Sequence, residues 1–295
     1  MKKNYSFTHI GLILLASMIW GFAFVAQKEG MNFIGPFLFN TLRFFIGTSI
    51  LLIIFLKKLK DINKKVLTSG IILGLILFAG ASFQQIGILY TQAGNAGFIT
   101  SLYIVFIPII GLFFKRKTSF LVWVAIFTAI VGFMFMSLDF NSLNLSIGDI
   151  LVFIGSIFWA LHVSLIESYA SLNKSIALAC IQFAVAGILS LIFTLSTESI
   201  SLEAIQMAWL PIAYAGIFSI SIAFTLQIYA QRFVPANIAG ILFSSEALFA
   251  LLGGILILNE KLLLRQWIGS LIILSAILFV QLIEKIKTKK IFLNN

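Results

Sequence analysis

Residues 93–111, AGNAGFITSLYIVFIPIIG, return in related form at residues 236–254 as ANIAGILFSSEALFALLGG. Six positions carry the same residue at an offset of 143, among them Ser101 and Ser244, and the rest of each segment is almost entirely apolar. Repetition at a fixed spacing is typical of a fold built from copies of one unit. Each segment is also about as long as the 20 residues that a membrane-spanning helix needs. The pair therefore predicts a membrane protein with an internal repeat.

The composition of the whole chain agrees with that prediction. Of 295 residues, 61% are apolar and 10% are charged, against about 45–50% and about 25% in soluble globular proteins. The formal charge of +10 is spread between apolar runs and forms no continuous stripe, so nucleic acid is not expected as a partner. Cys180 is the single cysteine, which excludes a disulfide within the chain and a cysteine-based metal site. We expect neither a metal nor a cofactor.

Ten apolar runs have about the length of a membrane span, and all are expected to be helices because open strands cannot satisfy their backbone in lipid. They lie near residues 8–27, 33–56, 67–90, 95–114, 119–137, 149–169, 175–195, 207–230, 236–258 and 264–283. With the segments between runs placed alternately on two sides, sixteen lysines and arginines fall on the side of the N-terminus. Only Lys28, Lys261 and Arg265 fall on the other, and Arg43 lies inside a run. Because basic residues accumulate in cytoplasmic loops, both termini are predicted to be cytoplasmic.

The repeat extends over both halves of the chain. Ser17 and Trp20 match Ser156 and Trp159 at an offset of 139, and Gln84 matches Gln227 at 143. A unit of five spans is odd, so the second copy must cross the membrane in the opposite direction. We predict an all-α membrane protein of ten helices in two inverted five-helix repeats, residues 1–140 and 147–285, followed by a basic cytoplasmic tail at 286–295. Inverted repeats are typical of transporters that bind substrate where the halves meet.

Arg43 is the basic residue inside an apolar run. Pro36, Asn40, Arg43 and Gly47 follow one another at steps of three and four, so they share one helical face. An arginine at membrane depth costs about 2.5–3.5 kcal/mol on insertion scales, which favours a position facing the protein interior. We expect Asn40 and Arg43 to face the substrate. Arg43 either anchors an anionic or carbonyl-bearing substrate or forms a structural ion pair with Glu246.

Other candidate binding residues are aromatic or polar side chains near the middle of their runs. Trp20 and Trp159 lie deep, whereas tryptophans usually mark the membrane interface, so they are expected to line a cavity or to serve in packing. Gln84 and Gln227 hydrogen-bond either across helices or to substrate. Thr100 and Tyr103 share a face, and Tyr103 aligns with Glu246 in the repeat.

Glu246 is the carboxylate that lies well inside a run, about ten residues from either end. Ionisable residues within the membrane are functional candidates by default. We therefore expect Glu246 to bind substrate, to pair with Arg43, or to carry the proton that couples transport to a gradient.

The sequence resembles the EamA-like branch of the drug/metabolite transporter superfamily along nearly its whole length. The residues that carry this resemblance are Trp20-Gly21, Leu42-Arg43-Phe44, Thr91 to Gly97, Pro235 to Gly240 and Ser245-Glu246. The resemblance implies export or exchange of small metabolites by alternating access, with spans 1 to 4 and 6 to 9 around a central cavity and spans 5 and 10 at the periphery. Members often have Glu-Pro where this chain has Glu246-Ala247, and Leu-Gly-Glu where it has Leu258-Asn259-Glu260. Because this chain lacks that proline, the sequence does not decide whether the helix is broken or continuous at Glu246.

The hypothesis favoured by these features is a secondary transporter for small metabolites or drugs in a bacterial cytoplasmic membrane, working by export or proton-linked exchange. No phosphate-binding glycine-rich loop, nucleophile elbow or HExxH motif occurs in the sequence, so we expect no enzymatic activity. A membrane enzyme acting on lipid and a channel are the alternatives. The expected partners are the substrate and the lipid bilayer. The sequence does not decide whether a second copy of the chain binds to form a homodimer.

Overall fold

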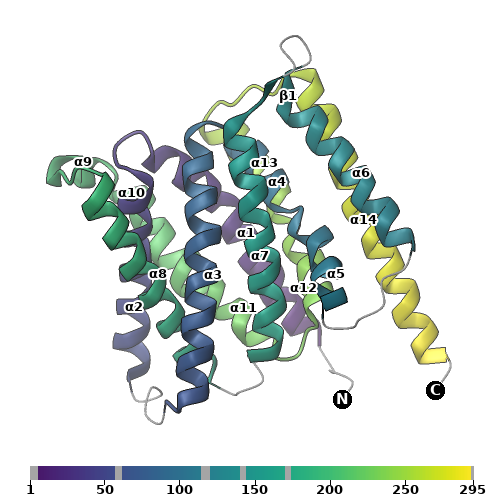
Figure 1. The fold of residues 1–295 in the computed structure, drawn as a ribbon, viewed down its shortest axis with the longest axis horizontal. Helices are drawn as coiled ribbons and strands as arrows, with labels where there is room; N and C mark the ends of the chain where they lie inside the picture. The colour runs from purple at the N-terminus through teal and green to yellow at the C-terminus, as the bar shows by residue number, and fades with distance from the viewer. Residues whose placement is uncertain (1–5, 57–61, 114–119, 140–143, 170–173, 294–295) are drawn as a thin grey trace.

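Long helices form almost all of the computed structural model, which describes residues 6–56, 62–113, 120–139, 144–169 and 174–293 (Figure 1). The first half contains α1 (Phe7–Gly30), α2 (Pro36–Phe55), α3 (Lys64–Leu89), α4 (Ala93–Thr100), α5 (Tyr103–Phe113) and α6 (Phe120–Ser137). The second contains α7 (Ile147–Tyr169), α8 (Ser175–Thr197), α9 (Leu202–Met207), α10 (Trp209–Ala213), the π-helix η3 (Tyr214–Ala223), α11 (Phe224–Ala230), α12 (Ala236–Phe243), α13 (Glu246–Ile257) and α14 (Leu264–Leu293). Strands β1 (Leu138–Asp139) and β2 (Asn144–Leu145) form a short antiparallel ribbon between α6 and α7. The predicted all-helical class is confirmed.

Eight helical segments in the described part of the chain are long and apolar enough to cross a membrane. They are residues 7–30, 36–55, 64–89, 93–113, 147–169, 175–197, 209–230 and 238–257. The expected fifth and tenth spans are present as α6 and α14, but their apolar stretches, Trp123–Phe135 and Leu264–Phe279, are shorter. The prediction of ten spans therefore remains a prediction, while a multi-span membrane protein is shown.

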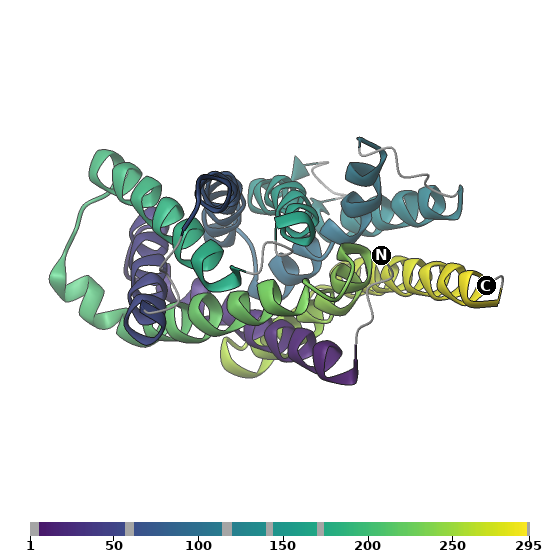
Figure 2. The same ribbon diagram turned by 90° about the horizontal axis from the view of Figure 1, so that it is seen from below.

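Helices α6 and α14 pack against each other at one edge of the bundle, and α14 extends away from the remaining helices (Figures 1 and 2). Gly132 permits their close approach, because a Cβ atom there would lie 2.9 Å from the carbonyl oxygen of Gly269. α14 continues through residues 286–293, so most of the predicted tail extends the last helix. The start of α1 and the end of α14 point toward the same end of the bundle (Figure 1).

The two halves of the chain are interleaved in the centre of the bundle. α3 packs between α7 and α8, α2 packs against α8 and η3, and α1 and α4 both pack against α13. Every one of these contacts joins the first half to the second. The centre of the molecule is therefore a boundary between the halves.

Charged side chains in the described part of the chain hold several helix ends. Glu198 accepts hydrogen bonds from the backbone N–H groups of Phe37 and Leu38 at 2.8 and 2.7 Å, and Glu260 does the same for Ala93 at 2.6 Å. The first N–H groups of a helix have no partner within it and carry partial positive charge, so a carboxylate stabilises them. The basic loops 57–61 and 114–119, on which the topology prediction depends, lie outside the described residues.

Candidate functional site

Two helices are interrupted at the middle of the bundle, at positions that match in the predicted repeat. α4 ends at Thr100 and α5 begins at Tyr103, while α12 ends at Phe243 and α13 begins at Glu246. Hydrogen bonds of the 3₁₀ type, from an N–H to the carbonyl three residues earlier, cross both interruptions. They run from Leu102 N to Ile99 O at 3.1 Å and from Ser245 N to Leu242 O at 3.3 Å. Such turns within a helix often mark hinges.

The interruption before Glu246 forms without proline. The hydroxyl of Ser244 donates to the carbonyl of Ile241 at 2.6 Å, and that of Ser245 donates to Leu242 at 2.8 Å. Serine hydroxyls compete in this way for carbonyls that would otherwise accept helical hydrogen bonds. Of the two possibilities that the sequence leaves open, the structure shows an interrupted helix at Glu246.

The two interruptions contact each other and α1. Ser101 Oγ, which donates to Gly97 O at 2.9 Å, lies 3.5 Å from Ser244 O, and Ser17 Oγ donates to Phe243 O at 3.1 Å. The hydroxyl oxygens of Ser17 and Ser245 also lie 2.6 Å apart, so either hydroxyl can donate to the other in place of its backbone carbonyl. The two interruptions and α1 thus meet at one polar contact.

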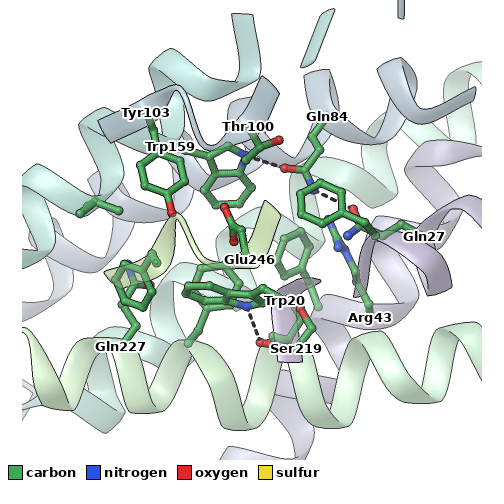
Figure 3. Close-up of a pocket in the computed structure, with 16 residues that line it drawn as sticks. Trp20, Gln27, Arg43, Gln84, Thr100, Tyr103, Trp159, Ser219, Gln227 and Glu246 are labelled. Atoms are coloured by element: carbon green, nitrogen blue, oxygen red, sulfur yellow. Dashed lines mark hydrogen bonds between the residues drawn. The ribbon is translucent and has the colours of Figure 1, made fainter. Parts of the chain in front are cut away.

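A cavity lies beside this contact, with about 50 Å³ of room for the centre of a water-sized molecule. Its walls include eight of the nine residues expected from the sequence to bind substrate (Figure 3): Trp20, Arg43, Gln84, Thr100, Tyr103, Trp159, Gln227 and Glu246. These side chains come from eight helices of both halves, while α6, α8 and α14 contribute none.

Asn40 is the expected site residue that does not line the cavity. Its side chain is buried, and Nδ2 donates to the carbonyl of Ala81 on α3 at 3.4 Å. Asn40 lies three residues before Arg43, which places it nearly one turn away along the helix. At that level its side chain contacts the backbone of α3, and substrate binding by Asn40 stays a prediction.

Several lining residues were not among the expected set. They are Phe24, Gln27, Phe44, Val163, Ser219, Ile220, Phe224 and Phe243. Gln27 was recognisable, because it lies two turns after Trp20 on the same helical face. Phe24 lies one turn after Trp20 on that face and was recognisable in the same way, whereas the other phenylalanines carry no such signal, since the chain contains 31 phenylalanines.

Arg43 and Glu246 both reach the cavity and do not pair with each other. Arg43 is 3% exposed and Glu246 is 4% exposed, and Arg43 Nε and Glu246 Oε1 each lack a hydrogen-bond partner. The Arg43 guanidinium lies 5.2 Å from the ring centre of Phe44 and 5.7 Å from that of Phe39. Rings at this distance attract a cation but do not neutralise it. The ion pair left open from the sequence is absent between these two described residues.

The acidic side of the cavity has further unsatisfied groups. The Tyr103 hydroxyl points toward the Glu246 carboxylate in Figure 3 and has no hydrogen-bond partner. Thr100 Oγ1 and Gln227 Oε1 are also buried without partners. A buried polar group without a partner costs about 1–3 kcal/mol. A ligand with complementary donors and acceptors would remove that cost.

Aromatic rings form the remaining walls. Phe224 lies between the two tryptophans, with ring centres 4.7 Å from Trp20 and 6.1 Å from Trp159. The indole N–H groups are both used within the protein: Trp20 Nε1 donates to Ser219 O at 3.3 Å, and Trp159 Nε1 to Gln84 Oε1 at 2.7 Å. The tryptophans therefore offer ring surface to a ligand. Among the described residues, no group of three or more His, Cys, Asp or Glu side chains could hold a metal ion.

These features define a class: a multi-span helical membrane protein whose central cavity, between its halves, has both aromatic and polar side chains in its walls. The profile of the EamA-like transporter family matches residues 8–138 and 146–282. The chain therefore belongs to the EamA-like transporter family.

Individual relatives agree with this assignment. An uncharacterised transporter of Archaeoglobus fulgidus is 34% identical over 288 residues, which cover 96% of this chain and 87% of the relative. The uncharacterised inner membrane transporter YedA of Escherichia coli K12 is 25% identical over 281 residues, covering 92% and 90%. A solved crystal structure shares the fold with a TM-score of 0.69 at 16% identity and covers 94% of this chain and 98% of its own. This protein is accordingly a membrane transporter.

Proposed function

We propose that this protein is a secondary transporter that moves small amphipathic metabolites or drugs across a bacterial cytoplasmic membrane, by export or proton-linked exchange. In this proposal ten spans form two inverted repeats, residues 1–140 and 147–285, and the cavity opens to each side of the membrane in turn. The observation that carries the proposal is the unpaired cation and carboxylate in one central cavity beside two helix interruptions. Interrupted helices at mid-membrane are where transporters of inverted-repeat design bind substrate and coupling ions.

The chemistry of the cavity suggests what kind of molecule it accepts. Arg43 favours an anionic or carbonyl group, the aromatic rings favour an apolar body, and Glu246 with Gln227 favours a hydrogen-bond donor. An amphipathic molecule of metabolite size can satisfy all three. The energy source is a gradient in this proposal, since the sequence contains no nucleotide-binding loop.

The test is flux into proteoliposomes across a metabolite panel, with and without an imposed pH gradient. We expect saturable flux, and we expect Trp20→Ala and Trp159→Ala each to reduce it severely, because each removes a wall of the cavity. Trp123→Ala and Trp267→Ala are the matched controls, since these side chains are 45% and 41% exposed and do not line the cavity. Equal transport by all four variants at matched protein levels would contradict an aromatic substrate site, and non-saturable flux would favour a channel.

The proposed topology can be tested separately by cysteine labelling in a Cys180→Ser background. A cysteine replacing Lys60 is expected to react from the cytoplasm, and one replacing the exposed Glu203 from outside. Equivalent loops of two inverted halves must face opposite compartments. Labelling of both positions from one side of the membrane would exclude the inverted repeat.

A further inference from the structure

A chain of hydrogen bonds connects a cavity wall to the backbone of α1. Trp159 Nε1 donates to Gln84 Oε1 at 2.7 Å, and Gln84 Nε2 donates to Gln27 Oε1 at 2.9 Å. Gln27 Nε2 then donates to Ala23 O at 3.1 Å. The chain links α7 of the second half to α3 and α1 of the first.

The direction of this chain is determined by its two ends. An indole N–H can only donate and a backbone carbonyl can only accept. Gln84 must therefore present its oxygen to Trp159 and its nitrogen to Gln27, and Gln27 must present its nitrogen to Ala23. Each amide group has one orientation that satisfies both neighbours, so the ring of Trp159 is held from a backbone atom of another helix.

The equivalent hydrogen-bond chain, at the matching positions of the predicted repeat, is not formed. At the offsets of the predicted repeat, Trp20 matches Trp159, Gln227 matches Gln84, and Ile166 stands where Gln27 would be. Isoleucine offers no acceptor to Gln227, and Trp20 donates to Ser219 O instead. Gln227 lines the cavity, is 1% exposed, and has no hydrogen-bond partner at Oε1.

We propose that the two glutamines have different roles in the transport cycle: Gln84 is a positioning residue that acts on substrate through Trp159, whereas Gln227 contacts substrate directly through its free amide oxygen. This inference rests on the proposed function in that both roles concern the substrate of the central cavity. In this proposal a hydrogen-bond donor of the substrate binds Gln227 Oε1, because a buried carbonyl oxygen without a partner gains a hydrogen bond only from a donor.

The positioning role predicts a physical change that needs no substrate. In a chain whose only tryptophan is Trp159, with Trp20, Trp123, Trp209 and Trp267 replaced by phenylalanine, Gln84→Met removes the acceptor while keeping the length of the side chain. We expect a fast depolarising component to appear in the fluorescence anisotropy decay of Trp159. In the matched chain that keeps only Trp20, Gln227→Met is expected to leave the decay unchanged, because Trp20 is held by Ser219. An unchanged decay for Trp159 would overturn the positioning role of Gln84.

Transport by the full-length protein tests both roles together, using the panel compound with the fastest flux. Gln84→Met and Trp159→Phe are each expected to raise the half-saturating concentration roughly threefold to tenfold, as for one hydrogen bond, and the double variant is expected to show no further loss. For Gln227→Met and Trp20→Phe the losses should multiply.

The division of roles would be overturned if the losses of affinity multiply for Gln84→Met with Trp159→Phe. It would also be overturned if Gln227→Met and Trp20→Phe together cause no more loss than either alone. If no panel compound is transported, the proposed function fails, and the anisotropy decay still decides whether Gln84 holds Trp159.

Discussion

Replacement of Glu246 by glutamine is expected to abolish flux driven by a pH gradient while substrate counterflow continues. Glutamine preserves the size of the side chain and its ability to hydrogen-bond, but it cannot take up or release a proton. Counterflow exchanges substrate for substrate and requires no net proton movement. Selective loss of the driven reaction would therefore identify Glu246 as the coupling group.

The structure strengthens the case for this residue. Glu246 is the first residue of α13, directly after the interruption, and its Oε1 faces the cavity without a partner. Because Arg43 does not pair with it here, protonation of Glu246 breaks no ion pair. The carboxylate thus lies at the wall of the space in which we propose that substrate binds.

The matched control is Glu203→Gln, which changes an exposed carboxylate on α9. It is expected to transport like the wild type at every pH, whereas counterflow by Glu246→Gln should lose the pH dependence of the wild type. Proton-driven flux that is unchanged in Glu246→Gln would exclude this residue as the proton carrier. Loss of both driven flux and counterflow would assign it to substrate binding.

Substitution of Arg43 by methionine is expected to stop transport and at the same time to stabilise the protein. A buried guanidinium without a carboxylate partner costs about 3 kcal/mol on insertion scales, and contacts with Phe39 and Phe44 return about 2 kcal/mol. Methionine removes the charge and keeps an apolar side chain, so we expect the free energy of unfolding to rise by about 1 kcal/mol. Residues that lower stability but serve function are common in binding sites.

The measurements are thermal unfolding in detergent and flux of an anionic panel compound beside its neutral ester or amide. The Lys64→Met variant, which changes an exposed cation at the start of α3, should alter neither quantity. Arg43→Lys retains charge but lacks the planar donor pair, so it should recover part of the anion flux. A large loss of stability in Arg43→Met would show that Arg43 supports the fold. An equal loss of flux for the anionic compound and its neutral derivative would argue against anion recognition.

Much of the fold follows from local sequence properties. Apolar runs of spanning length predict helices because a lipid environment leaves the backbone few other ways to satisfy its polar groups, and α1, α2, α3, α7 and α8 begin and end close to the predicted limits. The same reasoning brought Arg43, Glu246 and both tryptophans to the protein interior. Placing a charge or an indole at mid-depth in lipid is unfavourable enough to predict its direction without knowing its neighbours.

The sequence by itself therefore determined that this is a multi-span helical membrane protein and which polar side chains point inward. The tertiary structure alone decided what each one meets there: Asn40 contacts α3, Arg43 and Glu246 stay apart, Gln84 holds Trp159, and serines interrupt α12 before Glu246 without a proline. The physical reason is that hydropathy is a local property of the chain, whereas side-chain contacts join residues that are far apart in the sequence. Hydropathy acts on each residue separately, whereas a hydrogen bond requires two groups from distant parts of the chain to meet within about 3 Å, and that depends on how all the helices pack.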